Sequence, residues 1–180
     1  ARRGGDVILT YRHGADQARE VVAEIEAMGR KAAALRLDVG DVSSFGAFAA
    51  AVRAQLEAWD RTSFDHLVNN AGHGEMAMIA ETTEAQFDAL FDTHVKGVYF
   101  LTQTLLPLIA NGGRIVNFST GLTRVSVPGF SAYSAAKGAI EVLSVYMAKE
   151  FGHRGIAVNT VAPGAIETTS WAAPCATCPI

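Results

Sequence analysis

Apolar residues follow two different spacings along this chain, and the two spacings alternate. Short apolar runs at 6–12, 31–39 and 65–72 have the composition of buried strands. Between them, residues 15–29 and 43–59 place apolar side chains at every third or fourth position, which predicts amphipathic helices. Farther along, the same signals predict strands at 113–119 and 155–164, and helices after Thr83, at 94–109 and at 131–151.

Strands that alternate with helices of this length are joined by right-handed crossovers. The pattern therefore predicts a doubly wound α/β domain of the Rossmann type, with a parallel sheet covered by helices on both faces. Ligands of such folds bind beyond the carboxyl ends of the strands. We expect the polar or turn-forming residues that end these strands to line one rim of the sheet: Asp38-Val39, Asn69 to Gly72, Ser119-Thr120 and Pro163-Gly164.

Length and charge exclude several classes of protein. The chain has 180 residues, which suits one domain over residues 1–180 with an atypical tail at 170–180. A net charge of −3 provides no basic field for a nucleic acid. No apolar run approaches a membrane span and no signal peptide is visible, so we expect a cytoplasmic protein without membrane partners. Cys175 and Cys178 lack a second pair of ligands, and we predict no metal site.

Tyr133 and Lys137 are four residues apart in a run of small residues, and therefore lie one above the other on the predicted helix. They could be a packed aromatic residue and a solvated neighbour. Alternatively, an ammonium about 5 Å from the phenol would stabilise the phenolate by roughly 3 kcal/mol at an effective dielectric of about 20. That arrangement predicts a lowered Tyr133 pKa, as proton transfer near neutral pH requires.

Four motifs in this order resemble the short-chain dehydrogenase/reductase family: Asn69 to Gly72, the hydroxyl pair 119–120, Tyr133-x-x-x-Lys137, and residues 163–168. The resemblance covers about residues 6–169. It implies hydride transfer between a nicotinamide cofactor and a small carbonyl or alcohol substrate. Tyr133 is then the general acid/base, and Lys137 tunes it and binds the nicotinamide ribose. It also implies a homodimer or homotetramer formed through the helices at 94–109 and 131–151.

Two catalytic positions depart from the family pattern. The substrate-orienting hydroxyl, usually a serine thirteen residues before the tyrosine, falls on Thr120, with Ser119 and a purely structural turn as the alternatives. His94 stands where the family commonly has an asparagine whose main-chain carbonyl holds a relay water. It could take part in this relay or be a structural histidine.

The resemblance also assigns cofactor contacts. Asp38 and Val39 match the adenine contacts, and Asn70, followed by Ala71 and Gly72, matches the residue near the adenosine ribose. Pro163 and Gly164 lead to Ile166 and Thr168, which match the contacts of the nicotinamide carboxamide. Arg12 follows the strand at 6–12, and no carboxylate occurs before Asp16, which favours NADP over NAD; Arg12 could also be a solvated loop charge.

The glycine-rich phosphate loop of the family is not found in the sequence, and Gly72 to Ala77 match it only by chance. We expect a chain truncated or frame-shifted at both ends, lacking the first strand, which would lie between 6–12 and 65–72, and the final strand. Residues 1–180 alone should then bind the cofactor poorly and be inactive or unstable, which soluble expression of this piece with normal NADPH turnover would contradict. The complete protein is expected to be an NADP(H)-dependent oxidoreductase. The alternative is a degenerate nucleotide-binding protein without catalysis.

Overall fold

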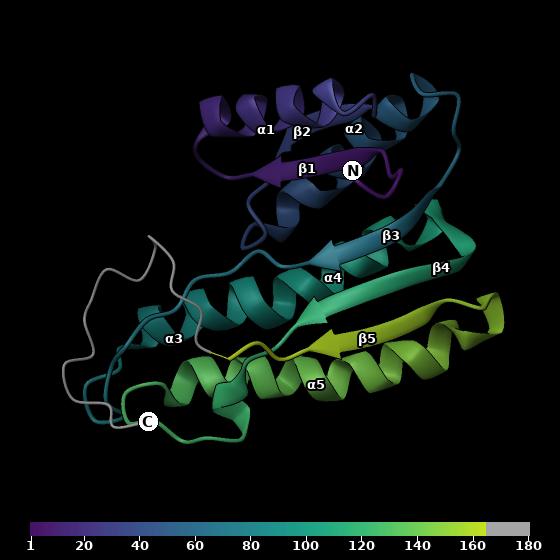
Figure 1. Cartoon of the computed structure of the whole chain (residues 1–180). Coiled ribbons are helices and arrows are strands. Elements are labelled where there is room, and N and C mark those ends of the chain that lie inside the picture. The colour runs from purple at the N-terminus through teal and green to yellow at the C-terminus, as the bar shows by residue number, and fades with distance from the viewer. Residues whose placement is uncertain (165–180) are drawn as a thin grey trace.

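Strands and helices alternate in the structure as the sequence predicts. The computed structural model describes residues 1–164 (Figure 1). The strands are β1 (Val7–Tyr11), β2 (Ala32–Arg36), β3 (Phe64–Asn69), β4 (Ile109–Phe118) and β5 (Ala157–Val161). The helices are α1 (Ala15–Ala27), α2 (Phe45–Glu57), α3 (Glu84–Phe91), α4 (Gly97–Leu105) and α5 (Ser131–Phe151).

All strand pairs are parallel, which confirms the predicted fold class. β1 pairs with β2, and β3, β4 and β5 form a second sheet in that order. β1 and β3 are not hydrogen-bonded to each other, so residues 1–164 form two sheets that lie side by side (Figure 1). The interruption lies between β1 and β3.

One hydrophobic core joins the two sheets across this interruption. Apolar side chains of α2, including Phe48 and Val52, pack against Leu101 and Leu105 of α4. In each helix the two side chains are four residues apart and therefore lie on the same face, which is buried against the other helix. Ile8 and Leu67 contact the same core from either sheet. Burial of each large side chain contributes about 1.5–3 kcal/mol, so packing holds the sheets together without a shared hydrogen bond.

A second core lies between α5 and the sheet of β3, β4 and β5. It contains Ile115, Met147 and Val158, all buried. Within residues 1–164, the opposite face of this sheet is open, since Val68 is 55% exposed and Val161 is 44% exposed. Within residues 1–164, helices α4 and α5 lie on the same face of these three strands (Figure 1).

Two local features differ from the sequence prediction. The helix predicted at 94–109 is α4 preceded by a π-helical turn, Asp92–Lys96, which directly follows α3. A Cβ atom at Gly97 would lie 2.1 Å from the Val39 carbonyl oxygen, so only glycine allows this close approach. Strand β4 begins at Ile109 and not at Gly113, because a register shift opposite β3 accommodates the Asn-Gly-Gly sequence inside the strand.

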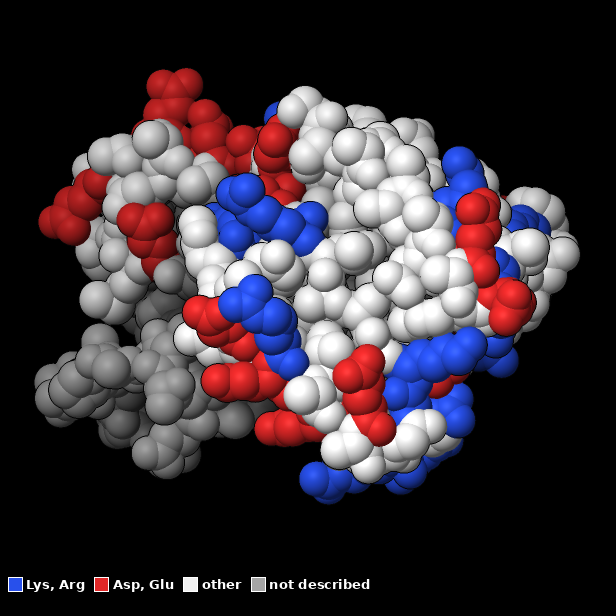
Figure 2. All heavy atoms as spheres, turned by 90° about the horizontal axis from the view of Figure 1, so that it is seen from above, with Lys and Arg blue, Asp and Glu red and all other residues white. Residues whose placement is uncertain are grey.

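Charged residues of both signs occur on the face of the molecule seen from above (Figure 2). Acidic and basic side chains are interleaved on the face shown in Figure 2, with uncharged surface between them. This face does not present the continuous basic field on which binding to a phosphate backbone depends. None of the helices within residues 1–164 combines the length and apolar character needed to cross a membrane.

Candidate active site

The carboxyl ends of β3, β4 and β5 bring the predicted site residues to one rim of the sheet (Figure 1). The segment after β4 is tied to the end of β5 by two main-chain hydrogen bonds. The Ser119 N–H donates to the Val161 carbonyl at 2.8 Å, and the Gly121 N–H donates to the Pro163 carbonyl at 2.9 Å. Helix α5 begins beside this segment, so its first turns face the rim.

Lys137 is buried on α5, one turn beyond Tyr133. It is 6% exposed, and its Nζ lies 5.8 Å from the centroid of the Tyr133 ring. The ammonium donates a hydrogen bond to the Phe118 carbonyl at 2.9 Å, at the last residue of β4. Burial lowers the pKa of Lys137 to about 8 because the charged form loses hydration.

The pKa of Tyr133 is shifted in the direction opposite to the sequence prediction. Burial raises it above its usual value, and the contribution that lowers it is a hydrogen bond with the Thr120 hydroxyl, not the charge of Lys137. The prediction of a lowered pKa is therefore wrong for this structure. It considered the attraction between phenolate and ammonium and left out the loss of hydration. Tyr133 is consequently a neutral phenol at neutral pH.

The two neighbouring hydroxyls, those of Ser119 and Thr120, make different contacts. Ser119 is 4% exposed, and its Oγ donates to Glu141 Oε1 at 2.7 Å. Thr120 contacts Tyr133, and its Oγ1 accepts a hydrogen bond from the Leu122 N–H at 3.3 Å. Because that bond uses an oxygen lone pair, the Thr120 hydroxyl proton remains for the phenol or a substrate oxygen. Of the two hydroxyls, that of Thr120 is therefore the one placed against the phenol.

His94 lies in the π-helical turn, 2% exposed, with its ring edge-on to Tyr133 at 5.4 Å between centroids. Its Nε2 is 2.6 Å from the His73 carbonyl oxygen, so Nε2 carries the proton and Nδ1 is an acceptor with no partner within residues 1–164. Burial, followed by the charge of Lys137, lowers the pKa of His94 to about 4. A Cβ at Gly72 would lie 2.3 Å from the ring, so Gly72 makes room for it.

We expect His94 to make the protein acid-sensitive. Its folded pKa of about 4 is below the unfolded value of 6.5, so the unfolded state binds more protons between these pH values. The stabilisation is complete above pH 6.5 and is lost as the pH falls toward 4. Urea unfolding at pH 7 and pH 4.5 should show that wild type loses about 2–3 kcal/mol more than His94→Asn does. His153→Asn, at an exposed position, should lose as much as wild type; equal losses in all three proteins would contradict this prediction.

A cleft of about 190 Å³ brings together most of the predicted adenosine contacts. Arg12, Asp38, Val39, Ala71 and Gly72 all line it. Asp38 Oδ1 accepts a hydrogen bond from the Gly40 N–H at 2.9 Å, which fixes the turn after β2.

The remaining predicted cofactor residues are not all at this cleft. Asn70 is exposed and is not part of its lining. Pro163 and Gly164 lie in the loop after β5, beside Gly121. Ile166 and Thr168, like Cys175 and Cys178, are outside the described residues.

A buried polar network behind the site was not predicted. Asn117, fully buried in β4, accepts a hydrogen bond from Asn69 Nδ2 at 2.8 Å and donates to Ser144 Oγ at 2.8 Å. Asn69 Nδ2 also lies 3.2 Å from Thr102 Oγ1. Asparagine inside an apolar strand pattern is the signal that could have indicated it, since buried amides need partners. The network joins β3, β4, α4 and α5 directly below the rim.

Comparison with known proteins places the whole arrangement in a family. A family model described as short chain dehydrogenase matches residues 1–176. Hydroxynaphthalene reductase of Aspergillus fumigatus is 32% identical over 95% of this chain and 61% of its own length. An uncharacterised oxidoreductase of Methylorubrum extorquens is 38% identical over 93% of this chain and 66% of its own length. The chain thus spans less than two thirds of each of these relatives.

Solved structures also match this chain, in both fold and sequence. A landomycin C-6 ketoreductase with bound NADP and rabelomycin has a TM-score of 0.84 and 36% identity, covering 88% of this chain and 65% of its own. A short chain dehydrogenase from Burkholderia cenocepacia in complex with NADP has the same TM-score and identity, covering 92% of this chain and 66% of its own.

Proposed function

Since the chain belongs to the short-chain dehydrogenase/reductase family, we propose that the protein is an NADP(H)-dependent oxidoreductase that reduces a carbonyl group on a small molecule. The observation that carries this proposal is the meeting of Tyr133, Thr120 and Lys137 at the rim where the strands end. A neutral phenol beside a second hydroxyl is the chemistry that carbonyl reduction needs, because the carbonyl oxygen gains a proton.

When bound, the reduced nicotinamide supplies the hydride for the carbonyl carbon. The Thr120 hydroxyl donates a hydrogen bond to the carbonyl oxygen and positions it at the phenol. The Tyr133 hydroxyl then donates its proton to that oxygen as negative charge develops there. Lys137, held by the Phe118 carbonyl, supplies positive charge that stabilises the resulting phenolate. We assign His94 a packing role beside the Tyr133 ring, since its imidazole is neutral at neutral pH.

The cleft that contains Arg12 fits the adenosine end of NADP. Arg12 lines it and makes no ion pair with any residue from 1 to 164, so its guanidinium is available for a 2′-phosphate. The solved relatives with bound NADP support the same cofactor.

We further propose a homodimer or homotetramer, because α5 exposes Val142, Val145 and Tyr146. A monomeric mass by light scattering would contradict this.

The proposal is tested by mixing the full-length protein with NADPH and bicyclic aromatic ketones, a choice suggested by the hydroxynaphthalene reductase relative. We expect loss of NADPH absorbance and a product alcohol. Arg12→Ala should lower kcat/KM for NADPH by roughly 10- to 100-fold, the value of one charge-assisted phosphate contact, and leave NADH unchanged. Arg53→Ala, at an exposed position on α2, is the matched control. Tight NADPH binding without reduction of any ketone would instead favour a non-catalytic nucleotide-binding protein.

A further inference from the structure

Glu141 lies on α5 one helical turn beyond Lys137, and its carboxylate binds the segment that follows β4. Oxygen Oε1 accepts two hydrogen bonds, one from Ser119 Oγ at 2.7 Å and one from Thr123 Oγ1 at 2.9 Å. These two residues flank Thr120 in the sequence. A single carboxylate oxygen therefore holds both ends of the short segment that carries the candidate substrate-orienting hydroxyl.

The carboxylate is the preferred acceptor of both hydroxyl protons. Ser119 Oγ also lies 3.2 Å from the Lys137 carbonyl, and Thr123 Oγ1 lies 3.0 Å from the Thr120 carbonyl. Each hydroxyl has one proton, and a hydrogen bond to an ionised group is about twice as strong as one to a neutral acceptor. The hydrogen bonds from Ser119 and Thr123 lower the pKa of Glu141, so it is ionised at neutral pH.

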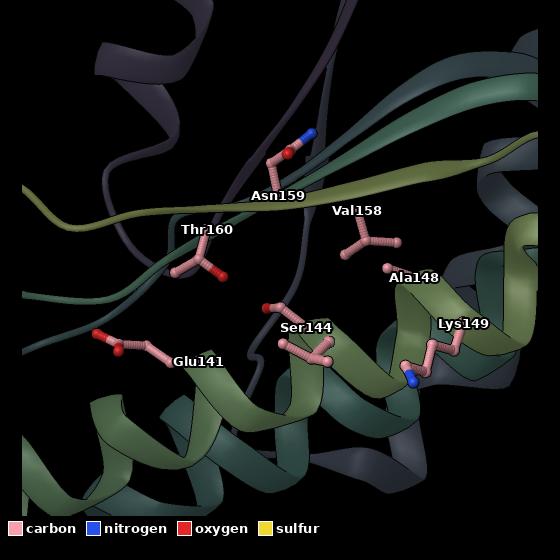
Figure 3. A pocket seen from close by; sticks show the side chains of 8 residues that line it. Glu141, Ser144, Ala148, Lys149, Val158, Asn159 and Thr160 are labelled. Carbon is pink, nitrogen blue, oxygen red and sulfur yellow. The ribbon is translucent and has the colours of Figure 1, made fainter.

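Figure 3 shows where Glu141 lies relative to β5. Glu141 and Lys149 stand at opposite ends of a hollow of about 410 Å³ between α5 and β5, and Glu141 lies at the end next to Thr160. This is the end at which β5 approaches the rim. The segment that carries Thr120 is thus held by main-chain bonds to β5 on one side and by Glu141 on the other.

We propose that Glu141 is a positioning residue that holds the Thr120 hydroxyl in register with Tyr133. The inference rests on the proposed carbonyl reduction, in which Thr120 orients the substrate oxygen. Without the carboxylate, Ser119 and Thr123 lose their shared acceptor and the segment between them can shift. A displacement on the order of 1 Å at a reacting group costs roughly 100-fold in rate.

Kinetics of the full-length protein test this role. Glu141→Ala should lower kcat for ketone reduction by roughly 10- to 100-fold, with KM for NADPH and the melting temperature nearly unchanged. Glu141→Gln keeps an acceptor oxygen and should retain more activity than the alanine variant. Adding Ser119→Ala to Glu141→Ala should cost little more, because the two residues act as one unit. Glu150→Gln, an exposed glutamate on the same helix, should match wild type.

Amide hydrogen exchange tests, without any substrate, whether Glu141 holds the segment 119–123 in place. The Arg124 and Val125 N–H groups donate to the Gly121 carbonyl, and both should exchange faster in Glu141→Ala but not in Glu150→Gln. Unchanged exchange with unchanged kcat would overturn the proposal, as would a loss of kcat matched by losses of NADPH affinity and melting temperature. If the wild-type protein reduced no ketone, the proposed reduction would be refuted. Faster exchange in Glu141→Ala would still support the role of Glu141 in holding the segment 119–123.

Discussion

Tyr133→Phe is expected to reduce ketone turnover of the full-length protein by roughly 100- to 10,000-fold, the contribution of a positioned general acid. The substitution deletes one oxygen and keeps the ring, so the edge-on contact with His94 should persist. Thr120 would still orient the carbonyl oxygen, but no group would deliver the proton. NADPH affinity, measured by fluorescence titration, should change less than about twofold because the substitution leaves the Arg12 cleft intact.

Tyr99→Phe is the matched control for this experiment. Tyr99 lies on α4, is exposed and contacts Phe100, so the loss of its hydroxyl should leave turnover unchanged. If Tyr133→Phe reduced ketones at the wild-type rate, the phenol would not be the proton donor and the proposed mechanism would fail. A large loss in both variants would indicate a general effect of removing tyrosine hydroxyls.

The order of elements was predictable because it depends on local patterns. The spacing of apolar residues predicted α5 at residues 131–151, as observed, and placed Tyr133 and Lys137 on adjacent turns. The rim was predictable for the same reason, since parallel strands end at a common edge. What the pattern could not contain is the identity of partners that approach from distant parts of the chain.

Lys137 illustrates this limit. Its hydrogen-bond acceptor is the main-chain carbonyl of Phe118, which no side-chain pattern indicates. The direction of the Tyr133 pKa was missed for a related reason: a helical spacing gives the separation of two charges but not the solvent each has lost. Glu141 was missed because an acidic residue on an exposed-looking helix position usually faces water, and its two hydroxyl partners lie eighteen or more residues earlier.

Lys137→Met is expected to separate activity from stability. Methionine fills nearly the same volume but removes the ammonium that stabilises the phenolate, so turnover should fall by roughly 100-fold or more. Burial of the charged lysine, however, destabilises the folded protein, because the ammonium loses hydration. Its pKa is accordingly about 8, against a usual value of 10.5. That difference of about 2.5 pKa units corresponds to roughly 3 kcal/mol of destabilisation by the charged form, offset in part by the hydrogen bond to the Phe118 carbonyl.

The sign of the pH dependence follows from these two pKa values. Between pH 8 and pH 10.5 the unfolded state binds more protons at Lys137 than the folded state, so this residue makes wild type more stable as the pH rises through that window. At pH 7 the cost is present in full, and Lys137→Met should melt no lower than wild type. The difference in unfolding free energy between the two proteins should then shift in favour of wild type from pH 7 to pH 9.5.

Lys149→Met, on the exposed side of the same helix, provides the comparison for both measurements. It should keep wild-type turnover, and its unfolding free energy should stay within about 0.5 kcal/mol of wild type at either pH. A Lys137→Met protein that melts well below wild type at pH 7 would mean that the ammonium stabilises the fold through its bond to the Phe118 carbonyl. A variant that remains fully active would mean that the charge plays no part in proton transfer. The expected combination, an inactive protein of undiminished stability, arises only if the buried charge is retained for chemistry at a cost to folding.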